Sequence, residues 1–265
     1  MKIERIILLI KKENLFFIRS KKIFFLIVAM LALGVLQIGL SYAFKSGKDS
    51  FSNFIYGAYN TYGQFFTIAV TGVLAGVICS EKENKTWDFY FTKTFTKFEI
   101  ITSKIIFYNL VILLTMIFVW IIIFFAGNLL NLEDPIKFIN IIYIIVISLS
   151  SIFTIINLEI FISGVSKKTS ISALSIVILW IVLLIINVLV PKELGGGYLA
   201  PFAQNSFQTS VVHRLLGMQG YVIPFESITN YPTSLEVFKA IFYAVSEGVV
   251  FIACSLIFTK KENLG

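Results

Sequence analysis

Two acidic residues lie inside long apolar stretches of the chain, where an ionisable side chain is unusual. Glu247 stands near the middle of residues 240–258, and Glu159 lies near the end of residues 139–162. A carboxyl group inside a membrane is costly, and it often lines a solute path or takes part in proton or ion movement. Both acids are therefore candidates for a translocation path.

A structural interpretation of the same two acids is also open. Glu247 precedes Gly248, so it could fix the packing of two helices that approach closely there. Glu159 lies within reach of Lys167 or Lys168 and could pair with either lysine. The residue types alone do not decide between transport and helix packing.

No catalytic or metal-binding pattern accompanies these acids. His213 is the single histidine and is expected at the surface, while Cys79 and Cys254 are the two cysteines. HExxH, GxSxG and GKS/T motifs are absent, which excludes a zinc protease, a hydrolase of the GxSxG type and a P-loop. We therefore expect a chain without enzyme activity, metal or cofactor of its own.

The composition indicates which elements must position the two acids. The 265 residues are 57% hydrophobic and 14% charged, whereas soluble domains are about 45–50% apolar and about 25% charged. A helix needs about 20 mostly apolar residues to cross a bilayer. We expect an all-α integral membrane protein, a single domain over 1–265, with spans at about 23–44, 56–78, 105–126, 139–162, 171–190 and 240–258.

The distribution of lysine and arginine orients these six spans. If the N-terminus is inside, the inner segments hold 16 Lys and Arg and the outer segments hold 6. Positive residues concentrate on the cytoplasmic side of membrane proteins. We therefore expect both termini in the cytoplasm, and a multi-pass protein of a bacterial cell membrane.

Residues 1–22 have the pattern of an amphipathic helix at the membrane surface. Apolar and basic side chains separate onto two faces at helical spacing. The apolar face contains Ile3, Ile6, Ile7, Ile10 and Phe17, and the basic face contains Lys2, Arg5, Lys12 and Arg19. A short basic flank that only sets topology is the alternative.

Residues 80–104, SEKENKTWDFYFTKTFTKFEIITSK, form a long cytoplasmic segment between the second and third spans. Phe95, Phe98 and Ile101 recur at helical intervals and predict a short amphipathic helix. Thr94 or Thr96 is suited to cap its start, and Glu99 stands three residues after Thr96, as a capping box requires. Such a helix could dock into a groove on another protein or lie on lipid.

Residues 191–239 are expected outside, before the last span. They are too polar for a full span but apolar enough to enter the membrane in part. Backbone at that depth must be helical or covered by protein. We therefore expect short re-entrant or surface helices.

The segment 80–104 resembles the loop between the second and third spans of type-2 ABC exporter permeases. Lys85 and Thr94 depart from that pattern, which usually has Gly and Pro there. The positions that carry the resemblance are Glu83, Thr86-Trp87-Asp88, Thr92-Lys93, Thr96-Lys97-Phe98-Glu99 and Ser103-Lys104.

The resemblance implies a permease subunit driven by a separate cassette ATPase, which would bind ATP and magnesium. Two permeases, identical or different, would pair in the transporter and act in export. Because the predicted path has few charges, we expect an amphipathic or hydrophobic substrate, for example a peptide. The residues expected to meet the ATPase are Asp88, Thr94, Phe95, Lys97, Phe98 and Glu99. Nucleic acid is not an expected partner.

Two other functions remain compatible with the residues. An ion- or proton-coupled secondary transporter would use Glu247, and a peptide-capturing immunity protein would use the outer residues 191–239.

Overall fold

A computed structural model describes residues 3–22, 24–25, 27–29, 32, 51–86, 95–129, 136–189, 206–217 and 231–261. The regular structure of these residues is entirely helical, which confirms the expected all-α class. The helices are α1 (Ile3–Arg19), α3 (Phe51–Leu74), α4 (Cys79–Glu83), α6 (Lys97–Leu129), α7 (Phe138–Val165), α8 (Thr169–Leu189), α9 (Phe207–Leu215) and α10 (Ser234–Lys261).

Three helices of the described part are long and apolar enough to cross a membrane. They cover Lys97–Gly127, Phe138–Val165 and Ser234–Phe258, and they correspond to the third, fourth and sixth predicted spans. Helices α3 and α8 occupy most of the second and fifth predicted spans. The first predicted span lies largely outside the described residues, so the count of six stays a prediction.

The predicted short helix near residue 98 is not a separate element. Helix α6 begins at Lys97 and continues without a break to Leu129. The sequence offers the physical reason, because no glycine or proline interrupts residues 97–125 and the apolar positions Ile101 and Ile105 continue into the span. A displacement of the start of α6 would therefore move the whole third span.

Helix α7 is the centre of the bundle and contacts α3, α6, α8, α9 and α10. Its closest neighbour is α10, where small residues let the two backbones approach. A Cβ atom added at Gly248 of α10 would lie 2.5 Å from the ring of Phe153 on α7. The Thr154 hydroxyl of α7 donates to the carbonyl of Ala244 on α10.

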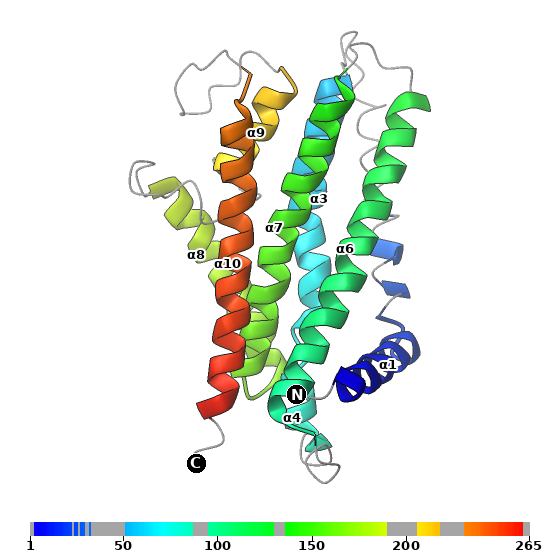
Figure 1. Cartoon of the computed structure of the whole chain (residues 1–265), viewed down its shortest axis with the longest axis vertical. Helices are drawn as coiled ribbons and strands as arrows, with labels where there is room; N and C mark the ends of the chain where they lie inside the picture. Colours follow the sequence, from blue (N-terminus) through cyan, green and yellow to red (C-terminus); the bar gives the residue numbers. More distant parts are fainter. Residues whose placement is uncertain are drawn as a thin grey trace.

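Different helices lie at the two ends of the bundle. Helices α1 and α4, the start of α6 and the last turn of α10 lie at one end, which we call the loop end, and α9 lies near the opposite end (Figure 1). The first and last described helices, α1 and α10, thus reach the same end of the bundle. Which side of the membrane the loop end faces stays a prediction.

Helix α9 shows that the segment 191–239 contains a short helix. Ser206 caps it by accepting a hydrogen bond from the Thr209 backbone N–H at 3.1 Å. The expectation of a surface position for His213 is wrong, because its side chain is 4% exposed and its ring contacts Tyr56 edge to face at 5.3 Å. This burial lowers the pKa of the His213 imidazole.

The close contact at Gly248 generates a prediction about stability. Gly248→Ala forces the Phe153 ring to move, and overpacking of this kind costs about 1–3 kcal/mol. The melting midpoint of the purified protein in detergent should fall by several degrees. Ala253→Val, on the exposed face of the same helix, should leave the midpoint unchanged. Equal midpoints for both variants would show that the two helices are not in close contact there.

Candidate functional site

The segment 80–104 leads into α6, and a capping box stabilises the first turn of that helix. The Thr96 N–H donates to Glu99 Oε2 at 3.0 Å, and the Glu99 N–H donates to Thr96 Oγ1 at 3.2 Å. This confirms the predicted pairing of Thr96 with Glu99. Arg5 of α1 lies 3.9 Å from the same carboxylate, so the start of α6 is also tied to α1.

The other end of the segment is fixed to α7 at the turn between α3 and α4. The backbone N–H groups of Ile78 and Cys79 donate to Ser163 Oγ at 3.0 and 3.3 Å. The Ser163 hydroxyl donates in turn to the carbonyl of Ala75 at 3.1 Å. One side chain of α7 therefore satisfies the backbone groups that the interrupted helix leaves open.

Two further contacts attach this end to α7 and α8. Lys82 Nζ donates to the carbonyl of Gly164, the next-to-last residue of α7, at 2.5 Å. Glu83 Oε2 accepts hydrogen bonds from the backbone N–H and the hydroxyl of Thr169 at 3.2 and 3.1 Å. A carboxylate at a helix N-terminus is favourable, so Glu83 stabilises the start of α8.

Lys104 joins the two ends of the segment. Its ammonium lies 2.9 Å from Glu13 Oε1 of α1 and 3.2 Å from Glu81 Oε1 of α4, and the side chain is 2% exposed. Lys12 contacts the same Glu81 oxygen at 3.1 Å. The Tyr108 hydroxyl donates to the second Glu13 oxygen at 3.5 Å. We call Glu13, Glu81, Lys12, Lys104 and Tyr108 the Lys104 cluster.

The Lys104 cluster contains residues that the sequence pattern did not single out. Glu13 lies on the buried stripe of α1, with Ile6, Leu9 and Phe17. The only feature of the sequence that indicates burial of Glu13 is its helical spacing from these apolar residues. Ile3 and Ile7, expected on the same apolar face, are 70% and 48% exposed, so the bundle covers only part of that face.

The residues predicted to meet an ATPase divide into three groups. Asp88 and Thr94 lie outside the described residues. Phe98 is 44% exposed, while Phe95 and Lys97 are half-buried. Glu99 is 3% exposed, because its carboxylate caps α6 within the chain. Their role in an interface stays a prediction.

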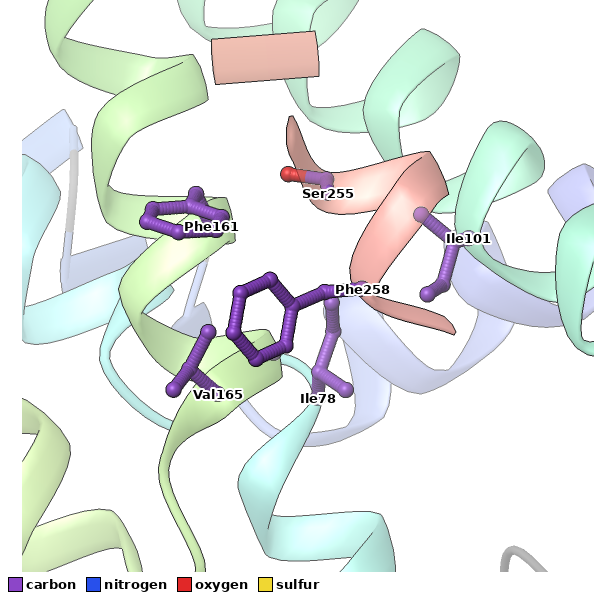
Figure 2. Close-up of a pocket in the computed structure, with 7 residues that line it drawn as sticks. Ile78, Ile101, Phe161, Val165, Ser255 and Phe258 are labelled. Atoms are coloured by element: carbon purple, nitrogen blue, oxygen red, sulfur yellow. The ribbon is translucent and has the colours of Figure 1, made fainter. Parts of the chain in front are cut away.

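A narrow apolar crevice lies beside the site, where α10 meets α6 and α7. Figure 2 shows the rings of Phe161 and Phe258 beside it, with Ile78 from the turn before α4 and Ile101 from α6. The rings of Phe161 and Phe258 meet edge to face at 5.9 Å. Helix α10 thus packs against both α6 and α7 beside the site.

The two membrane acids lie in different surroundings. Glu159 is fully buried, and Thr71 of α3 donates to its Oε1 at 2.6 Å, so its partner is neither Lys167 nor Lys168. Glu247 is half-buried, and among the described residues its carboxyl forms no hydrogen bond or ion pair. The described residues also contain no cluster of three or more His, Cys, Asp or Glu side chains able to hold a metal ion.

The Lys104 cluster generates a prediction about stability. Lys104→Met leaves two carboxylates without their buried cation, and breaking a buried pair costs about 3–5 kcal/mol. The melting midpoint in detergent should therefore fall strongly. The double variant Glu13→Gln/Lys104→Met removes the stranded charge while Lys12 still pairs with Glu81, so it should recover much of the loss. Equal midpoints for the single and double variants would contradict the pairing.

Comparison with known proteins identifies the family of this helical, multi-pass membrane protein. The family described as ABC-2 family transporter protein matches residues 8–262. A comparison with curated proteins finds no match. The match extends over nearly the whole chain and includes both ends of the segment 80–104. The chain therefore belongs to the ABC-2 transporter family, a family of membrane permeases that implies partnering with an ATP-binding cassette subunit.

Proposed function

We propose that the chain is the permease of an exporter in which a separate ATPase moves the segment 80–104, which we call the coupling segment. The observation that supports this most is the attachment of both ends of the segment. One end is bound to α7 and α8 through Ser163 and Thr169, and the other end is the start of α6. Lys104 connects the two ends to each other and to α1.

With both ends attached in this way, a displacement of the coupling segment would move the helices within the membrane. A force on the coupling segment acts on α1, α6, α7 and α8 at once, and packed helices move as rigid bodies. A tilt of these helices against a second copy of the permease, or against a related one, would open a path alternately to the two sides. The ATPase would hold ATP and magnesium, and this chain would transmit the movement.

The surface that would receive the ATPase is the predicted set Asp88, Thr94, Phe95, Lys97, Phe98 and Glu99. Phe98 is the strongest anchor of the described part, because it is a large apolar side chain that is 44% exposed beside half-buried Lys97. Aromatic residues dominate the binding energy of protein interfaces. Glu99 would act indirectly, by holding the start of α6 through the capping box.

The distribution of charged residues supports a proposal for the orientation and the cargo. The excess of Lys and Arg in the inner segments supports a cytoplasmic location of the loop end and of both termini, in the cell membrane of a bacterium. The apolar spans contain few charged groups, which suits an amphipathic or hydrophobic substrate such as a peptide. Export is the direction that the family resemblance of the coupling segment supports.

A substitution at Phe98 tests the interface. Phe98→Glu places a charge where an apolar anchor is expected, and loss of such an anchor costs 2 kcal/mol or more. Recovery of a cassette ATPase with the tagged protein from native membranes should fall about tenfold or more. Phe138→Glu changes a phenylalanine that is 70% exposed, at the start of α7 and far from the loop end, and should leave recovery unchanged.

Two outcomes would contradict the proposal. One is that no cassette ATPase accompanies the wild-type protein, and the other is that Phe98→Glu and Phe138→Glu recover equal amounts. A melting midpoint for each variant excludes a general loss of folding as the cause.

A further inference from the structure

The two acids of the membrane region differ in how the described residues surround them. Glu159 is enclosed between helices and its Oε1 accepts a hydrogen bond from Thr71, while its Oε2 is buried without a hydrogen bond from the described residues. Glu247 is only half-buried, and no described side chain donates to it. Both residues are glutamates within long apolar segments, and the difference in their partners arises from packing. Glu247 is the acid whose carboxyl the described residues leave without a hydrogen bond or ion pair.

At the depth of Glu247, a charged carboxyl group without a partner is costly in free energy. It lies 13 residues after Ser234 and 11 residues before Phe258, the bounds of the membrane-capable part of α10. At 1.5 Å per residue, the position is about 16–20 Å from either end. A charged side chain at the centre of a bilayer is expensive, and such residues normally pair with an opposite charge or face a polar cavity.

The neighbouring hydroxyl groups are already engaged with the backbone. Ser246 Oγ donates to the carbonyl of Tyr243 at 2.8 Å. Thr154 of α7 donates to the carbonyl of Ala244 on α10. A hydroxyl group has a single hydrogen to donate, so neither of these groups can also serve the Glu247 carboxyl. A donor must come from outside the described part of the chain.

The position of Glu247 on α10 makes it accessible from the hydrocarbon. Ala244 and Gly248 are buried against α7, whereas Tyr243 is 38% exposed and Val250 is 57% exposed. Residues three and four apart share one face of a helix. Glu247 shares its face with Tyr243 and Val250, at the margin of the contact between α10 and α7. A molecule dissolved in the membrane can reach it there.

Aromatic rings accompany the carboxyl on both sides. Tyr243 precedes Glu247 by one turn, and Phe251 follows it by one turn, so both rings share its face. Phe251 is held in place by stacking on Phe161 of α7, with ring centroids 6.4 Å apart. Aromatic faces attract cations, and this attraction is strongest where water is excluded. A carboxyl group with an aromatic side chain one turn before it and another one turn after it is complementary to one positive charge on an apolar body.

We propose that Glu247, with Tyr243 and Phe251, binds the positively charged group of an amphipathic cation that reaches α10 from the hydrocarbon of the membrane. This inference rests on the proposed transport function, because it specifies the chemical class of the cargo as lipophilic monovalent cations. An anion would be repelled by the carboxylate. A strongly hydrated polyvalent cation would lose too much hydration energy at this depth.

The experiment compares two probes of matched shape and opposite charge. The full-length protein is placed in lipid nanodiscs, and binding of radiolabelled tetraphenylphosphonium and tetraphenylborate is measured by equilibrium dialysis against protein-free nanodiscs. Wild-type protein should bind the phosphonium cation and not the borate anion. Glu247→Gln should weaken cation binding about tenfold or more, and Glu247→Asp should retain most of it.

Glu159→Gln is the matched control, because it makes the same change at an enclosed acid. It should leave binding of the cation unchanged. The melting midpoint and the elution volume in size-exclusion chromatography are measured for each variant. These measurements separate a lost binding site from a change in folding or in assembly.

Several results would overturn the inference. Equal cation binding by wild type and Glu247→Gln would do so, as would an equal loss in Glu159→Gln. A change of oligomeric state in Glu247→Gln would instead assign Glu247 to contact with another protein chain. No ATP or ATPase is present in this measurement, so its failure leaves recovery of the ATPase, and hence the proposed function, unaffected.

Discussion

The contact of Lys104 with Glu13 and Glu81 is the interaction on which the arrangement at the loop end depends. It joins three segments that are distant in the sequence, and it does so with a side chain that is 2% exposed. A buried ion pair contributes little net stability compared with apolar packing, but it strongly penalises any arrangement that separates its members. The cluster therefore specifies one relative position of α1, α4 and α6. A coupling segment needs such a defined position if it is to transmit movement.

The other contacts extend this defined position to the rest of the bundle. Ser163 and Thr169 connect the coupling segment to α7 and α8, and α7 contacts α3, α6, α8, α9 and α10. The tight contact at Gly248 then links α7 to α10. Interdigitated helices have few intermediate arrangements, because close packing resists gradual deformation. Movement of the coupling segment is accordingly expected to shift whole helices between discrete positions.

Local features of the fold could be predicted from the sequence, and long-range pairings could not. The capping box of Thr96 and Glu99 depends on a spacing of three residues, so the sequence alone indicates it. The pairing of Glu13 with Lys104 joins residues 91 positions apart, and no local pattern encodes such a contact. Burial of His213 depends in the same way on Tyr56 of a distant helix. Glu159 and Glu247 illustrate the limit most clearly, since similar sequence contexts led to different surroundings.

The most direct test of the account is the ATPase activity of the cassette partner in the presence of this permease. A permease that is moved by the ATPase is coupled to it, and we expect this coupling to change the rate at which the ATPase hydrolyses ATP. In nanodiscs, the wild-type chain should raise the hydrolysis rate of the bound partner about fivefold or more. The Glu13→Gln/Lys104→Met variant should bind the partner equally well and fail to raise the rate. Equal stimulation by both forms would contradict a role for the Lys104 cluster in coupling.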